Sequence, residues 1–386
     1  MKTFTAILQR HSIHILLLMM AGLVALGIVV LFSTSAFAEA SIAEIPDHLK
    51  KQALWLGVGL VVCTVSAMID YHMWQKLWWL VFAVAVILLA LCFVPHIGVR
   101  TKGAARWVAL GVGNFQPSEL AKVASVMFLA WWYARFAPRS REFLVGFVAP
   151  MAVVSILLGL IIIEVDLGAT ALIGAAMFAT MFVAGAGLRY LVPLALFGVA
   201  GVVYVATHIQ ERMGRLLAFL YPDKYPDEFY QQLQGLIAIG SGGLGGLGLG
   251  NGRQKMSYLP EAHNDFIFPI IGEELGLRVT LPVMAVYLIF GLCGYVVSLN
   301  ARDRFGTLLG FGFITTILLQ AAVNIGVTTA LLPNKGMGLP FISYGGSNLL
   351  VCMFMVGVLI NIHRHGRPVA IPLRQVKLAA RVTPRI

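Results

Sequence analysis

Residues 13–32, IHILLLMMAGLVALGIVVLF, decide the fold of this chain because nearly every side chain in the run is apolar. About twenty such residues in an α-helix span about 30 Å, the thickness of the hydrocarbon core of a membrane. Lys2 and Arg10 precede the run, and residues 36–38 resemble a signal-peptidase site. The apolar core is nevertheless longer than the ~7 to 15 residues usual in a signal peptide. We therefore expect an uncleaved first transmembrane helix.

The rest of the chain has the same character. Of its 386 residues, 59% are hydrophobic and only 12% are charged, and the mean hydropathy is +0.86. Soluble domains carry about 25% charged residues. Long continuous apolar runs suit membrane helices better than the alternating strands of a barrel. We expect an all-α, polytopic integral membrane protein forming a single domain over residues 1–386, with about ten spans. These lie near residues 12–35, 53–70, 77–95, 117–134, 143–163, 167–186, 189–207, 266–298, 305–331 and 348–363.

Cysteine usage and charge exclude several other classes of protein. The four cysteines all fall inside apolar runs, without the paired spacings of zinc or redox motifs, so we expect them to be packing residues. The net charge is +11, but the basic residues are scattered singly between the apolar runs. A nucleic-acid-binding surface would gather them into a stripe with aromatic residues. No nucleic-acid partner is expected.

The distribution of basic residues predicts the membrane topology. An even number of spans puts both termini on one side, and the side with more Lys and Arg is the cytoplasm. We therefore expect residues 1–11 and the basic tail 364–386 to be cytoplasmic. The opposite face receives residues 94–116, the large loop 208–264 between the seventh and eighth spans, and residues 333–347. The basic residues on the predicted cytoplasmic face are Arg135, Arg139, Arg141, Arg189, Arg302, Arg304, Arg364, Arg367, Arg374, Lys377, Arg381 and Arg385.

The large outer loop, residues 208–264, is too long to be a simple connection, because most connections are shorter than about 12 to 15 residues. It begins with a basic, partly amphipathic stretch containing Arg212 and Arg215, and continues into a glycine cluster at residues 240–250. Backbone N–H groups of such glycines could hold a diphosphate. The glycines equally allow close packing of helices, and no P-loop Lys-Ser/Thr follows them, which favours packing.

Asp265 stands out by position, where this polar loop meets the eighth apolar run. Its carboxylate would lie at the membrane surface, where the headgroup of a lipid is presented. An aspartate directly before an apolar helix is also a common N-cap, so the two interpretations remain open. His263, two residues earlier, has no second ligand at metal-binding spacing, which favours a loop contact over a metal site.

Other charged residues lie inside or beside predicted spans, where charge is costly unless it is paired. Glu119 and Lys122 are three residues apart near the start of the fourth span, and Glu274 and Arg278 are four apart in the eighth. Charge at this depth indicates a functional residue by default, whereas the structural interpretation is that each pair neutralises itself on one helix face. Asp166, in the short connection between the fifth and sixth spans, is predicted to cap the sixth helix.

The last outer loop, residues 331–347, is dense in Gly and Pro, which indicates an ordered turn. Lys335 within it places a cation near the surface, where either an anionic headgroup or solvent would meet it.

Taken together, these polar stretches resemble the SEDS family, the RodA, FtsW and SpoVE group. The matching motifs, in family order, are GAARW at 103–107, QPSELAK at 116–122, DLGAT at 166–170, LPEAHNDFIF at 259–268, GEELG at 272–276 and LPFISYGGS at 339–347. The chain departs from the family pattern at Val165, where Pro is usual, and at Asn264, Ala330 and Asn348. Details around Asp265, Arg212, Arg215 and Lys335 are more similar to the division branch, FtsW, than to the elongation branch, RodA.

The resemblance implies a function and its residues. Family members polymerise lipid II, with undecaprenyl diphosphate as leaving group, a reaction that needs a base for the acceptor hydroxyl and cations for the diphosphate. By motif, Asp265 is the essential carboxylate and the expected general base. A single base opposite the leaving group also predicts inversion at the donor carbon. The substrate-binding candidates are Arg106, Lys122, Lys335, Arg212, Arg215, Lys255, Glu119, His263 and Ser343.

The resemblance also implies partners and cofactors. We expect a single-span class B penicillin-binding protein, other divisome membrane proteins, and the lipid II substrate. No organic cofactor is expected. A divalent cation, Mg or Mn, could assist the diphosphate, but the sequence shows no metal cage.

Two functions of other classes stay open from the sequence. Intramembrane charges could line a path for flipping the same lipid, although no inverted repeat is visible in the hydropathy. The chain could also act as a scaffold for a transpeptidase, but the presence of Asp265 argues against an inert paralogue. A RodA-type elongation polymerase is the alternative within the family.

Overall fold

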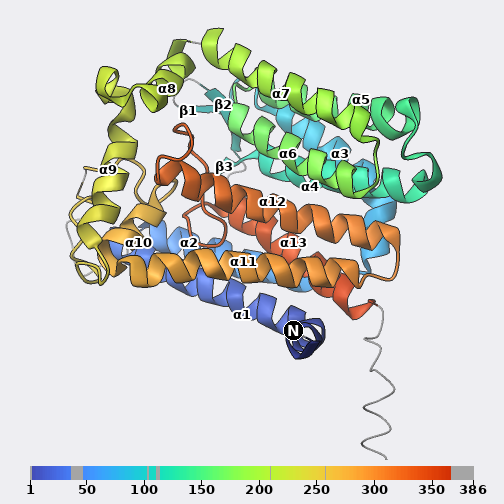
Figure 1. Cartoon of the computed structure of the whole chain (residues 1–386), viewed down its shortest axis with the longest axis horizontal. Coiled ribbons are helices and arrows are strands. Elements are labelled where there is room, and N and C mark those ends of the chain that lie inside the picture. The colour runs from blue at the N-terminus through green and yellow to red at the C-terminus, as the bar shows by residue number, and fades with distance from the viewer. Residues whose placement is uncertain are drawn as a thin grey trace, which may run out of the picture.

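The computed structural model describes residues 2–35, 47–101, 104–109, 114–208, 210–256 and 258–366, and these residues are mainly helical (Figure 1). Residues 36–38, which resemble a signal-peptidase site, lie outside the described residues. The α-helices are α1 Lys2–Ser35, α2 Asp47–Met68, α3 Tyr71–Leu91, α4 Pro117–Arg135, α5 Ala149–Ile163, α6 Leu167–Val183, α7 Leu188–His208, α8 Gln210–Leu220, α9 Pro226–Gly242, α10 Ile267–Leu275, α11 Leu277–Leu299, α12 Arg304–Thr328 and α13 Gly346–Arg364. A π-helical turn, Leu144–Val148, precedes α5, and short 3-10 turns occupy Ala137–Arg139 and Pro222–Lys224.

Among the described residues, seven helices are long and apolar enough to cross a membrane. Their spans are His11–Thr34, Asp47–Met68, Tyr71–Leu91, Leu144–Ile163, Leu277–Leu299, Arg304–Thr328 and Gly346–Arg364. Two shorter apolar helices, Leu167–Val183 and Leu188–Gly201, fall where the sixth and seventh spans are predicted. Helix α4 occupies the predicted fourth span and carries the charged pair Glu119 and Lys122. The total of about ten membrane spans stays a prediction.

The predicted eighth span, residues 266–298, was wrong as a single helix. It is two helices, α10 and α11, separated by Gly276, whose φ is 70°. This left-handed conformation suits glycine, and a Cβ at Gly276 would lie 2.4 Å from the backbone N of Gly246. The break therefore depends on the glycine cluster, which packs directly against it.

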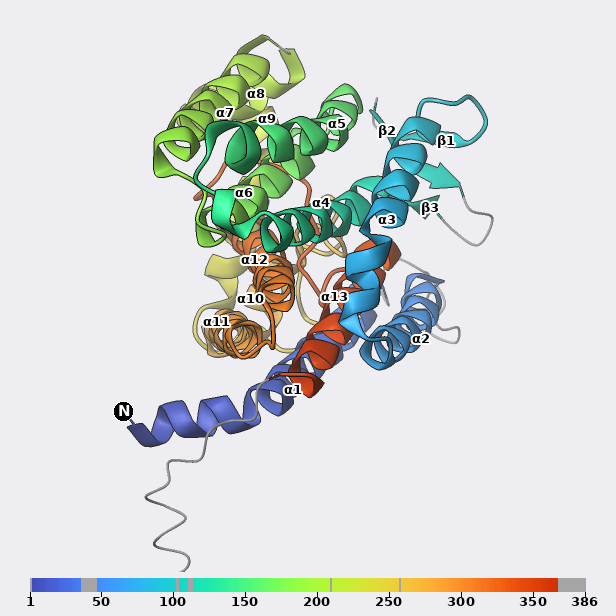
Figure 2. The same cartoon turned by 90° about the vertical axis from the view of Figure 1, so that its right-hand side faces the viewer.

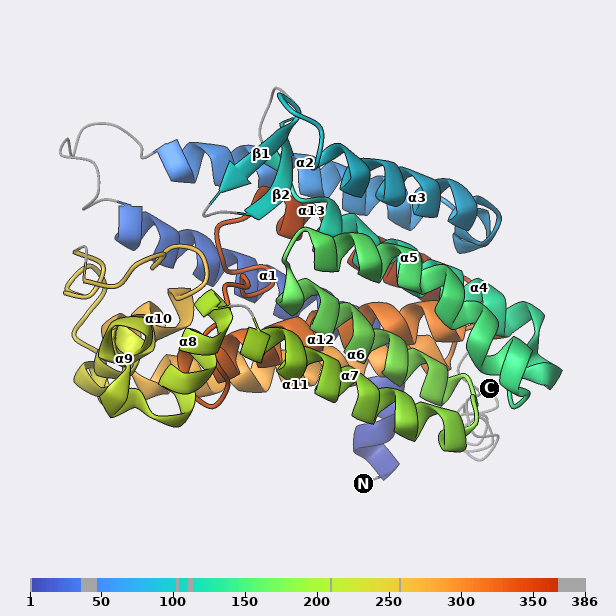
Figure 3. The ribbon, with the colours of Figure 1, turned by 90° about the horizontal axis from the view of Figure 1, so that it is seen from above.

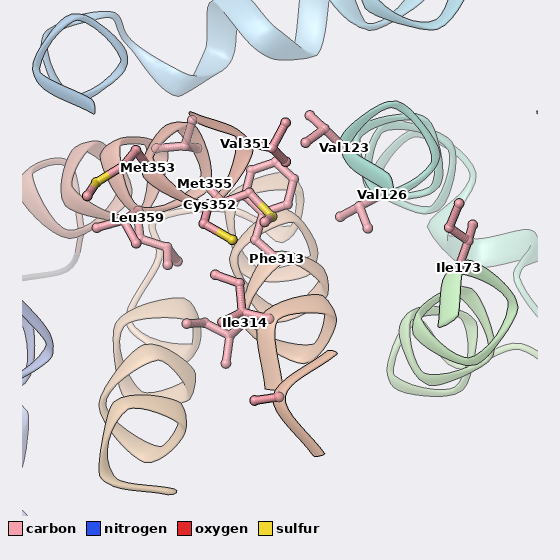
Figure 4. Packing of buried hydrophobic residues seen from close by; sticks show 14 of the residues in the cluster. Val123, Val126, Ile173, Phe313, Ile314, Val351, Cys352, Met353, Met355 and Leu359 are labelled. Atoms are coloured by element: carbon pink, nitrogen blue, oxygen red, sulfur yellow. The ribbon is translucent and has the colours of Figure 1, made fainter. Parts of the chain in front are cut away.

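The membrane helices form a bundle with α12 near its centre. Figure 2, which looks towards one end of the bundle, shows α12 among α4, α6, α11 and α13, and α12 contacts each of them. Apolar side chains from these helices interdigitate there, including Val126 of α4, Ile173 of α6, Phe313 of α12 and Val351 of α13 (Figure 4). Helix α13 also packs along α2, and α1 packs along α11. The bundle's core is thus built from helices far apart in sequence.

The expectation of an all-α chain needs one correction. Strands β1 Gly98–Thr101, β2 Ala104–Ala109 and β3 Asn114–Phe115 form a small antiparallel sheet in the order β1-β2-β3. The sheet lies within the predicted outer segment 94–116, where the backbone is not helical and its polar groups still need partners. Strand pairing provides them and fixes the position of Arg106 in β2.

The connections gather at two opposite ends of the bundle. In Figures 1 and 3, α8, α9 and α10 lie at the left-hand end, whereas α13 runs towards the right-hand end. At that right-hand end Arg304 donates a hydrogen bond to the Ala184 carbonyl, and Ser140 and Arg141 line the same cavity as Arg304. The connections predicted to share the cytoplasmic face are therefore neighbours in space.

Candidate active site

The site is built around Asp166, in the turn between α5 and α6. Lys335 Nζ lies 2.7 Å from Asp166 Oδ1, and Arg106 Nε lies 4.0 Å from Asp166 Oδ2. Arg106 also donates from Nη2 to the Val165 carbonyl at 2.7 Å. Three predicted motifs thus meet at one carboxylate, whose side chain is only 5% exposed.

Asp166 is also the N-cap of α6, as predicted, because its Oδ1 accepts a hydrogen bond from the Ala169 N–H. Burial favours the neutral acid, but the charges of Lys335 and Arg106 outweigh it and hold the pKa of the Asp166 carboxyl below its usual value. Asp166 is therefore an ionised anchor for two cations.

Asp265 lies against the same loop that carries Lys335. A Cβ on Gly336 would lie 2.5 Å from Asp265 Oδ2, so the carboxylate occupies the space beside the residue after Lys335. Asn324 of α12 donates hydrogen bonds both to the Asp265 carbonyl, at 2.8 Å, and to the Met337 carbonyl, at 2.6 Å. The N-cap of α10 is Phe266, without a side-chain capping bond, so the N-cap interpretation of Asp265 was wrong.

The charged pair of α4 lies beneath this loop. As predicted, Lys122 pairs with Glu119, with Nζ 2.6 Å from Oε2, and Lys122 also donates to Gln320 Oε1 at 2.7 Å. Gln320 in turn donates to the Gly338 carbonyl at 2.8 Å and to Asn348 Oδ1 at 2.9 Å. Since the Lys122 side chain is only 3% exposed, the pair supports the loop from inside the bundle and does not face a headgroup.

Ser343 and His263 hold two loops together. Ser343 Oγ donates to the Asn264 carbonyl at 2.6 Å and accepts from the Leu339 N–H at 2.7 Å. The His263 carbonyl accepts from the Tyr344 N–H at 3.1 Å, and the His263 ring packs against His48 at 4.8 Å between centroids. Burial and the neighbouring His48 lower the pKa of His263. Both residues position the loops around Asp265, which agrees with the loop contact predicted for His263.

Lys255 lies in a separate, fully buried ion pair. Its Nζ is 2.6 Å from Glu274 Oε1 and donates to Ser33 Oγ and to the Gly250 carbonyl, each at 2.9 Å. A lysine with a 0% exposed side chain does not fit the headgroup contact expected for it. The predicted pairing of Glu274 with Arg278 was also wrong. The helix is interrupted at Gly276, between these two residues, and the outer loop brings Lys255 to the Glu274 carboxylate instead.

The glycine cluster packs against α10 and the break that follows it. The backbone N–H groups of Leu247 and Gly248 donate to the carbonyls of Glu273 and Glu274, at 2.9 and 3.0 Å. The Gly246 N–H donates to Gly242 at 2.8 Å. These bonds engage the N–H groups of three consecutive residues within the fold, which fits the packing interpretation of the cluster.

The remaining candidates lie in α8. Arg215 is exposed on this helix, and Arg212 belongs to it, but the Arg212 side chain lies outside the part of the chain that the structure describes. Within the described residues, no three His, Cys, Asp or Glu side chains gather into a potential metal site.

Sequence reasoning missed three polar residues of the site. Gln320 and Asn324 lie four residues apart in the apolar run of α12 and therefore face the same side, which was a readable signal. Glu164, at the C-cap of α5, carries a carboxyl group that is almost fully buried beside Asp166. Its signal was an acidic residue at the end of an apolar run.

Comparison with known proteins gives consistent matches. The family model described as "Cell cycle protein", for FtsW, RodA and SpoVE, matches residues 13–368. A probable peptidoglycan glycosyltransferase FtsW from Geobacter metallireducens is 38% identical, over 92% of this chain and 95% of its own. Stage V sporulation protein E of Bacillus subtilis is 34% identical, over 89% of this chain and 95% of its own.

Solved structures agree with these matches. A chain of a peptidoglycan synthase complex, described for its structural coordination of polymerization and crosslinking, aligns with a TM-score of 0.73 and 26% identity, over 90% of this chain and 96% of its own. Rod shape determining protein RodA of Thermus thermophilus aligns with a TM-score of 0.68 and 25% identity, over 92% of this chain and 97% of its own. On the family match, these relatives and the shared fold, the chain belongs to the FtsW, RodA and SpoVE family of multi-pass membrane proteins.

Proposed function

We propose that this protein is a peptidoglycan glycosyltransferase that polymerises lipid II into glycan strands during septal cell-wall synthesis. The observation that carries the proposal is the loop at Lys335 and Gly336. Through these consecutive residues it contacts both the Asp166–Arg106 cluster and the carboxylate of Asp265. Cations for a diphosphate thus stand beside a carboxylate that can act as a base. Relatives named as probable FtsW glycosyltransferases support the division branch over the elongation branch.

In the proposed mechanism, Asp265 accepts the proton of the acceptor sugar hydroxyl as that oxygen attacks the anomeric carbon of the donor. The bond from this carbon to the diphosphate breaks, and undecaprenyl diphosphate leaves with the electron pair. Arg106 and Lys335 stabilise the charge that develops on the leaving group. Attack from the face opposite the diphosphate inverts the anomeric centre, with Asp265 as the only carboxylate required.

The other expected binding residues take supporting roles in this proposal. Glu119, Lys122, Ser343 and His263 hold the two loops in place around Asp265. Arg212 and Arg215 of α8 remain proposed contacts for the sugar or diphosphate. A divalent cation would bind mainly through the diphosphate itself, because the described residues contain no ready cluster of ligands for it.

We further propose that about ten spans cross the bacterial cytoplasmic membrane, with both termini inside and the active site outside. The spatial grouping of the basic connections at one end of the bundle, opposite the Asp166 cluster, supports this orientation. A class B penicillin-binding protein with a single span is the proposed partner, together with other division proteins. The similarity to a chain of a peptidoglycan synthase complex supports a partnership with a crosslinking enzyme.

Polymerisation and transport of lipid II can be separated directly. The purified protein is mixed with lipid II in detergent, with and without its penicillin-binding partner inactivated in any transferase site of its own. In parallel, liposomes containing the protein are tested for lipid II translocation. Glycan strands formed by the protein support the proposal. Translocation without strands in every combination contradicts it and favours the flippase.

A further inference from the structure

Glu164 carries a carboxyl group in an unusual setting. It is the C-cap residue of α5, directly before the Val165–Asp166 turn, and only 2% of it is exposed. The Cys92 thiol, a weak donor, is its one hydrogen-bonding neighbour among the described residues, and no stronger donor bonds its buried carboxyl oxygens. A buried carboxylate with so weak a partner is costly, whereas a neutral carboxylic acid costs much less. The mechanism proposed above does not use this group.

Arg106 has the complementary feature on the other side of the same turn. Its Nη2 is held by the Val165 carbonyl, but its buried Nε has no hydrogen-bond partner and stays 4.0 Å from Asp166. Val165 itself has a φ of 61°, a left-handed conformation that is strained for a β-branched residue. One strained turn therefore carries the weakly bonded carboxyl group of Glu164, and the Arg106 side chain that it holds has a donor, Nε, without a hydrogen-bond partner.

The surroundings of Glu164 set its charge. Burial is the largest effect and raises the pKa of Glu164 to about 8. A hydrogen bond from the Cys92 thiol, at the end of α3, lowers this pKa, the charge of the Asp166 carboxylate raises it, and the charge of the Arg106 guanidinium of β2 lowers it. Among the residues that the structure describes, these three are the titratable and charged groups that act on Glu164 from the elements packed around it. At neutral pH the neutral acid therefore predominates.

The charge of Glu164 matters because the net charge of the neighbouring cluster is small. Arg106 and Lys335 bring two positive charges, and Asp166 removes one. With a neutral Glu164, one net positive charge remains for a lipid diphosphate. With an ionised Glu164 the cluster is formally neutral, and the new carboxylate competes for the same guanidinium.

We propose that Glu164 is a positioning residue that controls Arg106 by its protonation. As the neutral acid it leaves the Arg106 guanidinium able to bind the diphosphate of the lipid, and as the carboxylate it draws Arg106 away. This inference rests on the proposed function only in taking a prenyl diphosphate as the ligand of the cluster.

The test measures binding and not turnover. Farnesyl diphosphate is titrated into the purified full-length protein by calorimetry from about pH 6 to about pH 10, above and below the midpoint expected for Glu164. The wild type is compared with Glu164→Gln, which keeps the shape of the neutral acid. Glu142→Gln, which removes an exposed carboxylate paired with Arg139, serves as the matched control.

For the wild type and Glu142→Gln, we expect the dissociation constant to rise about tenfold as pH passes 8, because the ionised carboxylate removes the cluster's one net positive charge and a typical coupling between linked sites is about 5- to 150-fold. For Glu164→Gln, we expect no such rise. A persistent rise in a folded Glu164→Gln protein overturns the inference, and so does a wild type whose affinity is independent of pH or which does not bind the probe. Polymerisation of lipid II is scored separately, so a protein that binds as expected but forms no strands refutes the proposed enzyme and leaves the role of Glu164 intact.

Discussion

Lys335 Nζ lies 2.7 Å from Asp166 Oδ1, although the two residues are 169 positions apart in the chain. The aliphatic part of the Lys335 side chain passes so close to Gly168 that a Cβ on Gly168 would lie 2.0 Å from Lys335 Cε. This contact fixes the loop between α12 and α13 on the first turn of α6. Because Gly336 comes next, the same contact fixes the wall against which Asp265 rests.

Gly336→Ala should disturb Asp265 without disturbing the fold. The added Cβ would lie 2.5 Å from Asp265 Oδ2, so the carboxylate must move. A misplacement of about 1 Å commonly costs about 100-fold in rate, and we expect a loss of that order in lipid II polymerisation. Gly240→Ala is the control, because nothing lies within 4 Å of a Cβ at this α9 position. Equal activity of the two variants would show that Asp265 tolerates the displacement.

The Glu119–Lys122 pair should be strongly non-additive. Lys122→Met leaves the Glu119 charge buried without its cation, and breaking a buried pair in this way costs about 3 to 5 kcal/mol. Replacing both residues, as Glu119→Gln with Lys122→Met, should cost much less than the sum of the single changes. Apparent melting temperatures in detergent measure all three variants. Simple additivity would mean that the two residues do not act as a pair.

Glu164 should also make stability depend on pH. The unfolded chain releases this proton near the ordinary value of 4.5, whereas the folded chain keeps it until about 8. Between these values the folded state binds more protons, so its stability falls as pH rises, by up to about 1.4 kcal/mol per pH unit from this group. The difference in melting temperature between Glu164→Gln and the wild type should therefore grow in favour of the variant from about pH 5 to about pH 8. A constant difference would place the Glu164 pKa at its ordinary value.

Val165 should resist replacement by the residue usual in the family. Proline cannot adopt a φ of 61°, and it lacks the N–H that Val165 donates to the Ile162 carbonyl at 2.9 Å. We expect Val165→Pro to lower the melting temperature and to weaken diphosphate binding, since the Val165 carbonyl also holds Arg106. Val165→Gly removes the side-chain strain and should be tolerated far better. A fully stable Val165→Pro protein would mean that the turn readily takes the other conformation.

The membrane helices could be predicted because apolar runs of this length have few alternatives in lipid. Local pairs were predictable too, since Glu119 and Lys122, and Asp166 and Ala169, are neighbours on one helix turn. The helix break at Gly276 could not be predicted from the sequence, because the apolar run continues across it. The cause of the break is the packing of the glycine cluster some thirty residues earlier.

The same limit applies to the candidate site. The motifs around Asp265, Lys335 and Arg106 could be singled out from the sequence, but their meeting at Asp166 depends on tertiary packing. For Glu274 the nearest cation in sequence is Arg278, yet the folded outer loop supplies Lys255. Partners brought together by loops cannot be read from spacing, whereas partners on one helix can.

The central claim, that Asp265 is the carboxylate on which polymerisation depends, is tested most directly by Asp265→Asn. This change keeps the size of the side chain and removes its basicity. Asp223→Asn, at an exposed aspartate in the predicted outer loop, is the control. With the penicillin-binding partner present and inactivated in any transferase site of its own, we expect glycan strands from the wild type and from Asp223→Asn, and none from a folded Asp265→Asn protein. Strands of normal yield from Asp265→Asn would contradict the account.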